Sequence, residues 1–199
     1  MRDMSKISRR MSVKLALGSA VALTAPNLAF GQSKVPRPGQ YNSTSFMTAE
    51  PGFAPPLIPF RDENDAPHTI DEWHGGITLI CFWATNCTGC TYEMPALSRL
   101  KKVYKPEGFR ILPIAMVEDD VPKIKRFYQR FGVEDMPIYI DAWGRMFNEY
   151  TPPHPDYGAR ATPTTVVMDR EGLIRSAYVG VADWENEGLE VLEWYQRFG

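Results

Sequence analysis

Two cysteines three residues apart, Cys87 and Cys90, are the chemically most informative residues of this 199-residue chain. At the first turn of a helix, one thiol of such a pair points outward and the other lies within disulfide reach. The partial positive charge of a helix N-terminus stabilises a thiolate and so lowers the pKa of a cysteine there. The pair therefore supplies a nucleophile, a resolving thiol and a reversible two-electron couple, although the same spacing also provides half of a zinc site.

The segments on either side of the pair favour redox chemistry over zinc binding. An apolar run over 77–83, rich in β-branched and aromatic residues, predicts a buried strand, and apolar residues at helical spacing predict a helix over 87–104. The pair thus lies at a strand-to-helix junction, where redox chemistry needs it. A zinc site needs two further ligands, and the remaining candidates form no second paired motif: Cys81, His68, His74 and His154.

Three blocks of sequence follow one another between residues 55 and 199. The first, around the cysteine pair, is Phe82-Trp83-Ala84-Thr85-x-Cys87-x-x-Cys90-x-x-Glu93-x-Pro95-x-Leu97. The second is Ala161-Thr162-Pro163-Thr164-Thr165, continuing to Gly172, and the third is Val179-Gly180-x-x-Asp183-Trp184. Together they resemble TlpA/ResA-type thioredoxin-like thiol–disulfide oxidoreductases, within the redoxin or AhpC-TSA-like group. The resemblance implies an α/β, thioredoxin-like fold: a central mixed sheet with helices on both faces, preceded by a short N-terminal hairpin.

The order of predicted elements agrees with that fold. A short strand or hairpin is expected over 57–70, with its turn at Asp62-Glu63-Asn64-Asp65. Continuous apolar runs predict parallel strands that are buried on both sides. After strand 77–83 and helix 87–104, the expected elements are strand 109–117, helix 121–131, strand 136–140, short helix 144–150, strand 164–168, strand 173–179 and helix 184–197.

The resemblance also implies roles for residues around the dithiol. Pro163 is expected to be cis and to lie against the dithiol, with the backbone of Thr162 free to pair with an extended substrate segment; the alternative is an ordinary strand-start proline. Glu93 lies one helical turn after Cys90, and the matching family glutamate helps to protonate the resolving cysteine. The residues alone leave open whether Glu93 is a desolvated acid–base group or a solvated helix glutamate.

The site departs from the family pattern in two ways. Asn86 stands where the family commonly has tryptophan, and Thr88-Gly89 stands where it usually has at least one proline. Asn86 removes an aromatic surface beside the thiol and glycine loosens the first helical turn, so both changes bear on the redox potential and the partner. Trp83 is expected to form the wall of the substrate groove or the core beside it, and Cys81 to be a buried, inert thiol.

Two other functions are compatible with a thioredoxin fold. A peroxiredoxin-type peroxidase usually has threonine or serine three residues before its reactive cysteine and proline four residues further back, where this chain has Ala84 and Ile80. A copper-binding metallochaperone commonly spaces its cysteines one residue wider and adds a histidine ligand, and no histidine here matches that pattern. Both remain alternatives to the oxidoreductase.

The N-terminus predicts export. Five basic residues and one acid over 1–14 precede an apolar stretch over 15–25 and a small-x-small sequence that ends at Gly31, which is the layout of a signal peptide cleaved near Gly31. The run over 8–14 is close to a twin-arginine signal, so twin-arginine and general export both stay open. The apolar stretch has about half of the roughly 20 residues that span a bilayer, and a retained anchor is the alternative.

These features divide the chain into three parts. Residues 1–31 are predicted to be the export signal, residues 32–56 a flexible tether rich in Pro, Gly, Ser and Thr, and residues 57–199 one thioredoxin-like domain. Without the leader, 17 basic and 23 acidic residues remain, a net charge of −6. Because no basic patch or stripe is present in the sequence, nucleic acid is a poor candidate partner.

Together, the residues and the resemblance predict a periplasmic thiol–disulfide oxidoreductase. Cys87 attacks a partner disulfide and Cys90 resolves the mixed disulfide. Family analogy favours reduction of partner proteins, in cytochrome c maturation or at metal-site thiols. No cofactor is expected because the cysteines carry the electrons; an upstream membrane electron donor re-reduces them. The mature chain is expected to be a monomer without a membrane span.

Overall fold

A computed structural model of the protein describes residues 30–32, 46–116, 119–141, 143–153 and 158–198. Nearly all of the predicted export signal, most of the predicted tether and His154 lie outside the described residues. Within the described segments, no helix is both long enough and apolar enough to cross a bilayer.

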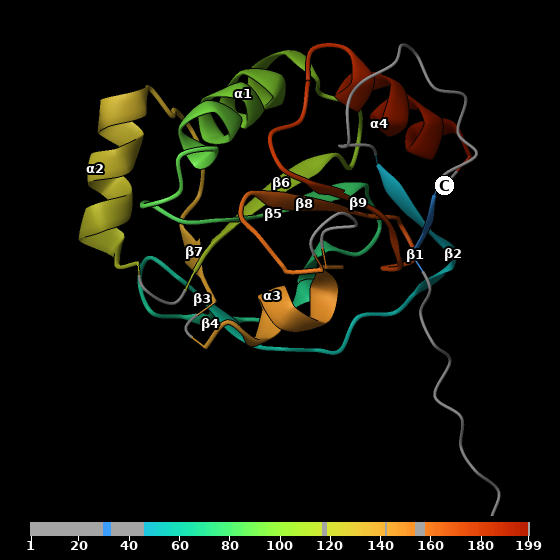
Figure 1. Ribbon diagram of the computed structural model, residues 1–199, viewed down its shortest axis with the longest axis horizontal. Coiled ribbons are helices and arrows are strands. Elements are labelled where there is room, and N and C mark those ends of the chain that lie inside the picture. Colours follow the sequence, from blue (N-terminus) through green and yellow to red (C-terminus); the bar gives the residue numbers. More distant parts are fainter. Residues whose placement is uncertain (1–29, 33–45, 117–118, 142, 154–157, 199) are drawn as a thin grey trace, which may run out of the picture.

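Within the same segments, nine strands form one mixed sheet in the order β1-β2-β9-β8-β5-β6-β7-β3-β4 (Figure 1). At its centre β5 and β6 run parallel, with Leu79 beside Ile111, and β8 runs antiparallel to both β5 and β9. The predicted central mixed sheet is therefore confirmed. The strands are β1 (Phe30–Gln32), β2 (Met47–Phe53), β3 (Phe60–Asp62), β4 (Pro67–His68), β5 (Thr78–Trp83), β6 (Arg110–Ala115), β7 (Tyr139–Ile140), β8 (Thr164–Met168) and β9 (Ile174–Val179).

Helices cover both faces of the sheet, as predicted. Leu79, Cys81 and Trp83 of β5 enter a core shared with α1, α2 and α4, whereas Ile80 and Phe82 enter a second core shared with α3. In Figure 1, α1 and α4 lie above the sheet and α3 lies below it. The helices are α1 (Cys90–Val103), α2 (Val121–Phe131), α3 (Arg145–Tyr150), α4 (Glu187–Phe198) and a short 3-10 helix, η1 (Ile70–Trp73).

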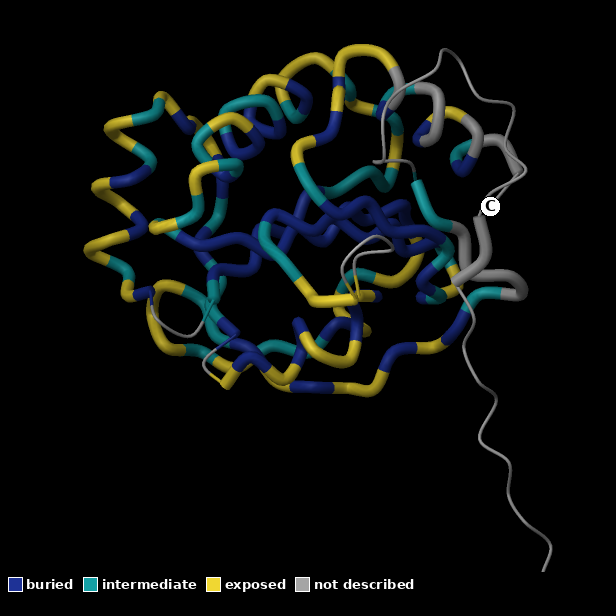
Figure 2. The backbone as a smooth tube through the Cα atoms, in the orientation of Figure 1, coloured by how far each residue is buried: buried dark blue, intermediate teal, exposed yellow. Residues whose placement is uncertain are grey.

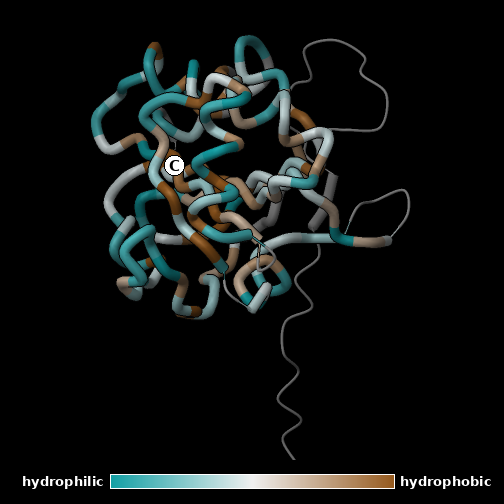
Figure 3. Tube along the Cα trace, turned by 90° about the vertical axis from the view of Figure 1, so that its left-hand side faces the viewer, coloured by the Kyte–Doolittle hydropathy of each residue, from teal (hydrophilic) through white to brown (hydrophobic). Residues whose placement is uncertain are grey.

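The central strands form the buried base on which the site is built. All six residues of β5 are buried, and the central strands are the most continuous buried part of the tube in Figure 2. Figure 3 shows from a perpendicular direction that hydrophobic stretches lie mainly inside and hydrophilic stretches mainly in the outer turns. Because close-packed interiors move little, β5 gives the loop that carries Cys87 a fixed origin.

The hairpin expected over 57–70 is confirmed. β3 and β4 are antiparallel, with Phe60 opposite His68. The Asp62 carboxylate closes the turn by accepting the backbone N–H groups of Asn64 at 2.8 Å and Ala66 at 2.9 Å. Aspartate favours turns because its side chain can bond nearby backbone groups in this way.

The structure differs from the tether expected over 32–56. Met47–Phe53 form β2, which pairs antiparallel with β9 and places Met47 beside Ala177. Phe46, just before β2, packs against Tyr178 with ring centroids 5.0 Å apart. Without β2, the outer edge of β9 would expose unpaired backbone groups. Composition alone did not predict this strand because its partner is more than 120 residues away in the sequence.

Element ends differ from the predictions by a few residues. α1 begins at Cys90, three residues later than expected, and residues before it form turns in which the Cys87 N–H donates to the Ala84 carbonyl at 3.2 Å. α4 likewise begins three residues late, at Glu187. Hydrophobic spacing locates the body of a helix, but local turn geometry decides where its first hydrogen bond forms.

Candidate active site

Cys87 and Cys90 form a disulfide at the start of α1, with their Cα atoms 5.3 Å apart. Cys90 is the first residue of the helix and is fully buried, whereas Cys87 lies in the preceding loop and is partly exposed. The Cys90 backbone N–H points at Cys87 Sγ, 3.2 Å away. In the reduced protein this donor and the helix N-terminus would stabilise a thiolate on Cys87, the cysteine that a partner can reach.

The segment before β8 lies against the dithiol. The Thr162–Pro163 peptide bond is cis, and the Thr162 carbonyl oxygen lies 3.3 Å from Cys87 Sγ. A Cβ placed on Gly89 would lie 3.0 Å from Pro163 Cδ and 3.2 Å from Val181 Cγ2. Gly89, expected to loosen the helix start, therefore also allows two other segments to pack closely against it.

Glu93 is fully buried, so the alternative of a solvated helix glutamate is wrong. Three donors from distant parts of the chain reach its carboxylate. Trp184 Nε1 donates to Oε1 at 2.7 Å, the Ala182 N–H donates to Oε2 at 3.0 Å and Thr165 Oγ1 lies 3.4 Å from Oε1. Burial raises the pKa of Glu93 from its ordinary 4.5 to about 7, and these hydrogen bonds act in the opposite direction. A carboxyl group with such a pKa can give or take a proton near neutrality.

Cys81 lies deep in the core beside Glu93, as expected for a buried cysteine. Its side chain is fully buried in β5. Burial, and to a lesser extent the nearby Glu93 charge, raises the pKa of the Cys81 thiol. A neutral thiol is a poor nucleophile, so Cys81 is inert in exchange chemistry.

Trp83 does not line an open groove, which corrects one of the two placements that the sequence allowed. Its side chain is 1% exposed and packs against Phe127 and Tyr128, with ring centroids 4.9 and 5.7 Å away. Asn86 is exposed beside Cys87. Of these two residues, only Asn86 can meet a docking protein directly.

Asp119 is a site residue that the sequence interpretation missed. One of its carboxylate oxygens accepts the Thr85 backbone N–H at 2.8 Å, and the other accepts the Thr85 hydroxyl. These bonds clamp the loop between β5 and Cys87. A signal was available, because β5 and β6 are parallel neighbours, and the loops that follow such strands leave from the same edge of a sheet.

Trp184 and Thr165 are the other residues missed. Both fall within blocks that resemble the family, yet neither had a predicted role. Each lies more than 70 positions from Glu93 in the sequence. No local pattern indicates that they meet the same carboxylate.

The chain is similar to known proteins both in sequence and in fold. A family model described as the AhpC/TSA family matches residues 51–177. The chain is 27% identical over 135 residues to the thiol-disulfide oxidoreductase ResA of Geobacillus thermodenitrificans, covering 68% of this chain and 72% of that protein. It is 28% identical over 113 residues to the thioredoxin-like protein YneN of Bacillus subtilis, covering 56% and 61%.

Solved structures share the fold. A thiol:disulfide interchange protein of the thioredoxin family from Chlorobium tepidum superimposes with a TM-score of 0.58 at 22% identity, covering 72% of this chain and 96% of that one. StoA from Bacillus subtilis superimposes with a TM-score of 0.53 at 18% identity, covering 70% and 96%. At these identities the likeness establishes the thioredoxin-like architecture.

Proposed function

The chain belongs to the AhpC/TSA family, as a thioredoxin-like thiol–disulfide oxidoreductase of the TlpA/ResA type, and we propose that it is a periplasmic reductant of protein disulfides. The observation that carries the proposal is the Cys87–Cys90 disulfide at the start of α1, with one sulfur accessible and the other buried. This asymmetry suits a nucleophile and a resolving thiol.

The reaction runs through two exchanges. The Cys87 thiolate attacks one sulfur of the partner disulfide, forming a mixed disulfide and releasing the other partner sulfur as a thiolate that takes up a proton. Cys90, deprotonated, then attacks Cys87 Sγ and displaces the second partner thiol. The Cys87–Cys90 disulfide has formed, and two electrons have passed to the partner.

Glu93 is the group to which we assign the proton of Cys90. It lies one turn along α1 from Cys90, and both side chains are buried away from bulk water. A buried thiol needs a nearby base, and the raised pKa of Glu93, about 7, lets its ionised form accept the proton near neutral pH. In the reverse direction the protonated acid returns it.

The partner is proposed to dock over Cys87 beside Thr162 and Asn86. The Thr162 carbonyl lies beside Cys87 Sγ, so an extended partner segment that pairs with this backbone would bring its disulfide to the thiolate. Exposed Asn86, in place of an aromatic ring, leaves room for a bulky protein surface.

The cellular setting completes the proposal. A leader cleaved near Gly31 delivers the chain to the periplasm, where a membrane electron donor reduces Cys87–Cys90 again. Substrates are protein disulfides, of the kind found in cytochrome c maturation or at metal-site thiols, and the mature protein acts as a monomer. The basic and apolar N-terminal sequence and the similarity to ResA support this assignment.

The test is trapping of the partner. Cys90→Ser is expected to accumulate mixed disulfides with a protein disulfide substrate, and Cys87→Ser is expected to form none. The reduction potential of the pair then fixes the direction: a value near about −270 mV supports a reductant, and one near about −120 mV an oxidant. Labelling of Cys90 before Cys87 by an alkylating agent at pH 6 would overturn the assignment of the nucleophile.

The two alternative functions have their own readouts. Consumption of hydrogen peroxide that requires Cys87 but is indifferent to Cys90→Ser would indicate a peroxidase. Tight Cu(I) binding that disappears when the pair is oxidised, without disulfide reductase activity, would indicate a metallochaperone.

A further inference from the structure

We propose that Trp184 is a positioning residue, whose indole N–H holds the Glu93 carboxylate in place and sets how readily it exchanges a proton with Cys90. The inference rests on the proposed function of Glu93 as the proton acceptor and donor of the dithiol. Trp184 acts through its hydrogen bond to Glu93.

Trp184 belongs to a short segment, residues 180–184, that reaches three parts of the site. The Gly180 N–H donates to the Pro163 carbonyl at 2.8 Å, and Val181 lies against Gly89, between the two cysteines. Ala182 and Trp184 then each donate to Glu93. This one segment thus contacts Pro163, the start of α1 at Gly89, and the buried Glu93.

The two donors of this segment hold the carboxylate in a defined orientation. The Ala182 N–H binds Oε2 and Trp184 Nε1 binds Oε1, so the two oxygens are held separately. Trp184 is 1% exposed, which fixes its indole, and Phe46 packs edge-on against it with ring centroids 6.0 Å apart. A hydrogen bond to a charged acceptor from a donor that cannot move away is strong and directional.

The indole favours the ionised form of Glu93. An indole N–H can donate but cannot accept, so it stabilises a carboxylate more than a carboxylic acid. The Thr165 hydroxyl, by contrast, can rotate to donate to the carboxylate or to accept from the acid. Trp184 and Ala182 therefore oppose the desolvation of Glu93, while Thr165 can serve both protonation states.

The titration of Glu93 can be followed apart from that of the neighbouring thiols. Among the described residues, Thr165, Ala182 and Trp184 donate to its carboxylate and Cys81 of β5 interacts with its charge. Cys90 precedes it by one turn of α1. Cys81 stays a neutral thiol because burial raises the pKa of its side chain. In the oxidised protein Cys90 is bonded to Cys87 and does not titrate, so neither neighbouring thiol titrates together with Glu93 near neutral pH.

The experiment is a pH titration of the Glu93 side-chain carboxyl by ¹³C NMR in the oxidised protein, with Glu93→Gln to identify the resonance. Trp184→Phe is expected to raise the midpoint by about one to two pH units, because it removes a hydrogen bond to the charged form. Trp73→Phe, at a partly buried tryptophan of η1, is the matched control and should leave the midpoint in place. A folded Trp184→Phe protein with an unshifted midpoint would overturn the proposal.

A double-mutant cycle separates positioning from general structural support. Trp184→Phe should move the pH profile of the resolving step upward in the wild-type background and leave it unmoved in the Glu93→Gln background. An equal effect in both backgrounds would contradict action through Glu93. If Trp184→Phe fails to fold, the tryptophan analogue with sulfur in place of the indole N–H keeps the ring shape and removes only the donor.

The two levels of proposal fail in distinguishable ways. If the wild-type protein shows no disulfide exchange, the proposed function is wrong, whatever the NMR titration gives. If disulfide exchange is normal and the midpoint of the Glu93 titration is unchanged by Trp184→Phe, only the role of Trp184 is wrong.

Discussion

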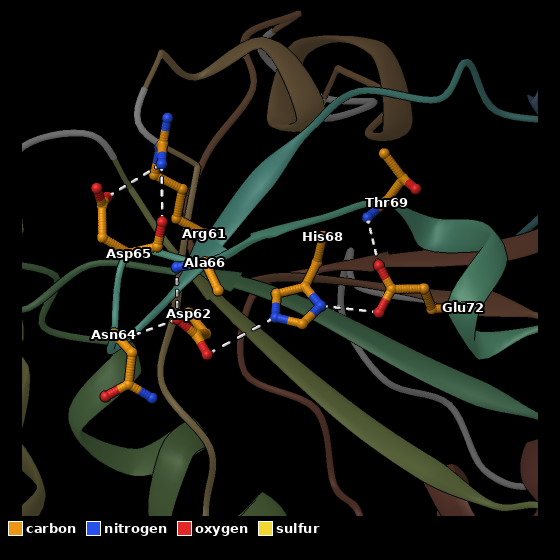
Figure 4. Close-up of polar contacts among 8 residues, drawn as sticks. All are labelled: Arg61, Asp62, Asn64, Asp65, Ala66, His68, Thr69 and Glu72. Atoms are coloured by element: carbon orange, nitrogen blue, oxygen red, sulfur yellow. Dashed lines mark hydrogen bonds and ion pairs between the residues drawn. The ribbon is translucent and has the colours of Figure 1, made fainter.

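Two glutamates of this protein have similar hydrogen bonds and opposite pKa shifts. Glu72, in η1, accepts the Thr69 N–H at 3.0 Å and binds His68 Nδ1 at 2.8 Å, and these contacts lower its pKa (Figure 4). Glu93, in α1, accepts bonds of 2.7 and 3.0 Å, yet its pKa rises to about 7. Hydrogen-bond length therefore does not explain the difference.

Solvent access and partner charge explain it. The Glu72 side chain is 45% exposed and pairs with a histidine that can become cationic, whereas Glu93 is 0% exposed and its partners are neutral donors. Water solvates the Glu72 charge, and His68 attracts it. Neutral donors offset only part of the cost of desolvating Glu93. The same residue type thus stays an ordinary acid at the surface, whereas burial brings its pKa close to neutral pH in the core.

The largest expected effect on the free energy of unfolding comes from deleting the Glu93 carboxylate, and deleting the Glu72 carboxylate is its comparison. Glu93→Ala leaves the buried N–H groups of Trp184 and Ala182 without an acceptor, and each such group costs about 1–3 kcal/mol, so a loss of about 4 kcal/mol is expected. Glu72→Ala should cost under about 1 kcal/mol, because water replaces the lost bonds. Urea unfolding at pH 5, where Glu93 is neutral, measures both. Equal losses would remove the contrast between the two regions.

The second effect is the pH dependence of stability. The pKa of Glu93 is raised from 4.5 to about 7, so its contribution is complete below pH 4.5 and is lost as the pH rises through 7. The loss is on the order of 3 kcal/mol. Glu93→Gln should remain flat over this range while the wild-type stability falls. Unfolding curves at several pH values compare the two, and parallel profiles would show that Glu93 ionises as freely as a solvated acid.

Asp119 is an intermediate case, because it is 9% exposed and its carboxylate binds the Thr85 N–H and hydroxyl. Asp119→Asn keeps the shape but offers only one oxygen as acceptor, so a loss of about 1–2 kcal/mol is expected. Disulfide exchange at Cys87 should also slow, because the loop before it is released. Asp120→Asn, at the neighbouring N-cap of α2, is a control expected to affect stability without slowing exchange.

The smallest effect is expected at His68. Its pKa is raised, mainly by the hydrogen bond to Glu72 and opposed by desolvation, so its contribution is present below pH 6.5 and is lost as the pH rises through the raised value. The pKa of Glu72 is lowered, so its contribution to stability is fully present above its ordinary pKa of 4.5 and is lost as the pH falls through the lowered value. His68→Gln should cost under about 1 kcal/mol between these limits, and less in high salt. A cost that persists at pH 9 would point to ring packing against Phe60 and Trp73 instead.

Much of the fold could be predicted from local patterns. The continuous apolar run of β5 and the helical spacing after it located the strand, the helix and the dithiol between them, because these patterns reflect each element's own periodicity. The turn residues of the β3–β4 hairpin located that element for the same reason. The Cys87–Cys90 pair could be recognised from its spacing and from the strand-to-helix junction on which it lies.

Other features depended on the tertiary structure. Helical spacing puts Glu93 on the same face as Cys90, but the elements that cover that face decide whether water reaches it. Those elements come from β8 and from the 180–184 segment, 72 to 91 positions away. β2 and the Thr85–Asp119 clamp likewise require partners that are distant in sequence. Residue type and local spacing therefore establish which groups of this chain can react. The proton affinity of Glu93 follows instead from the folded structure, because desolvation depends on every segment packed around the carboxylate.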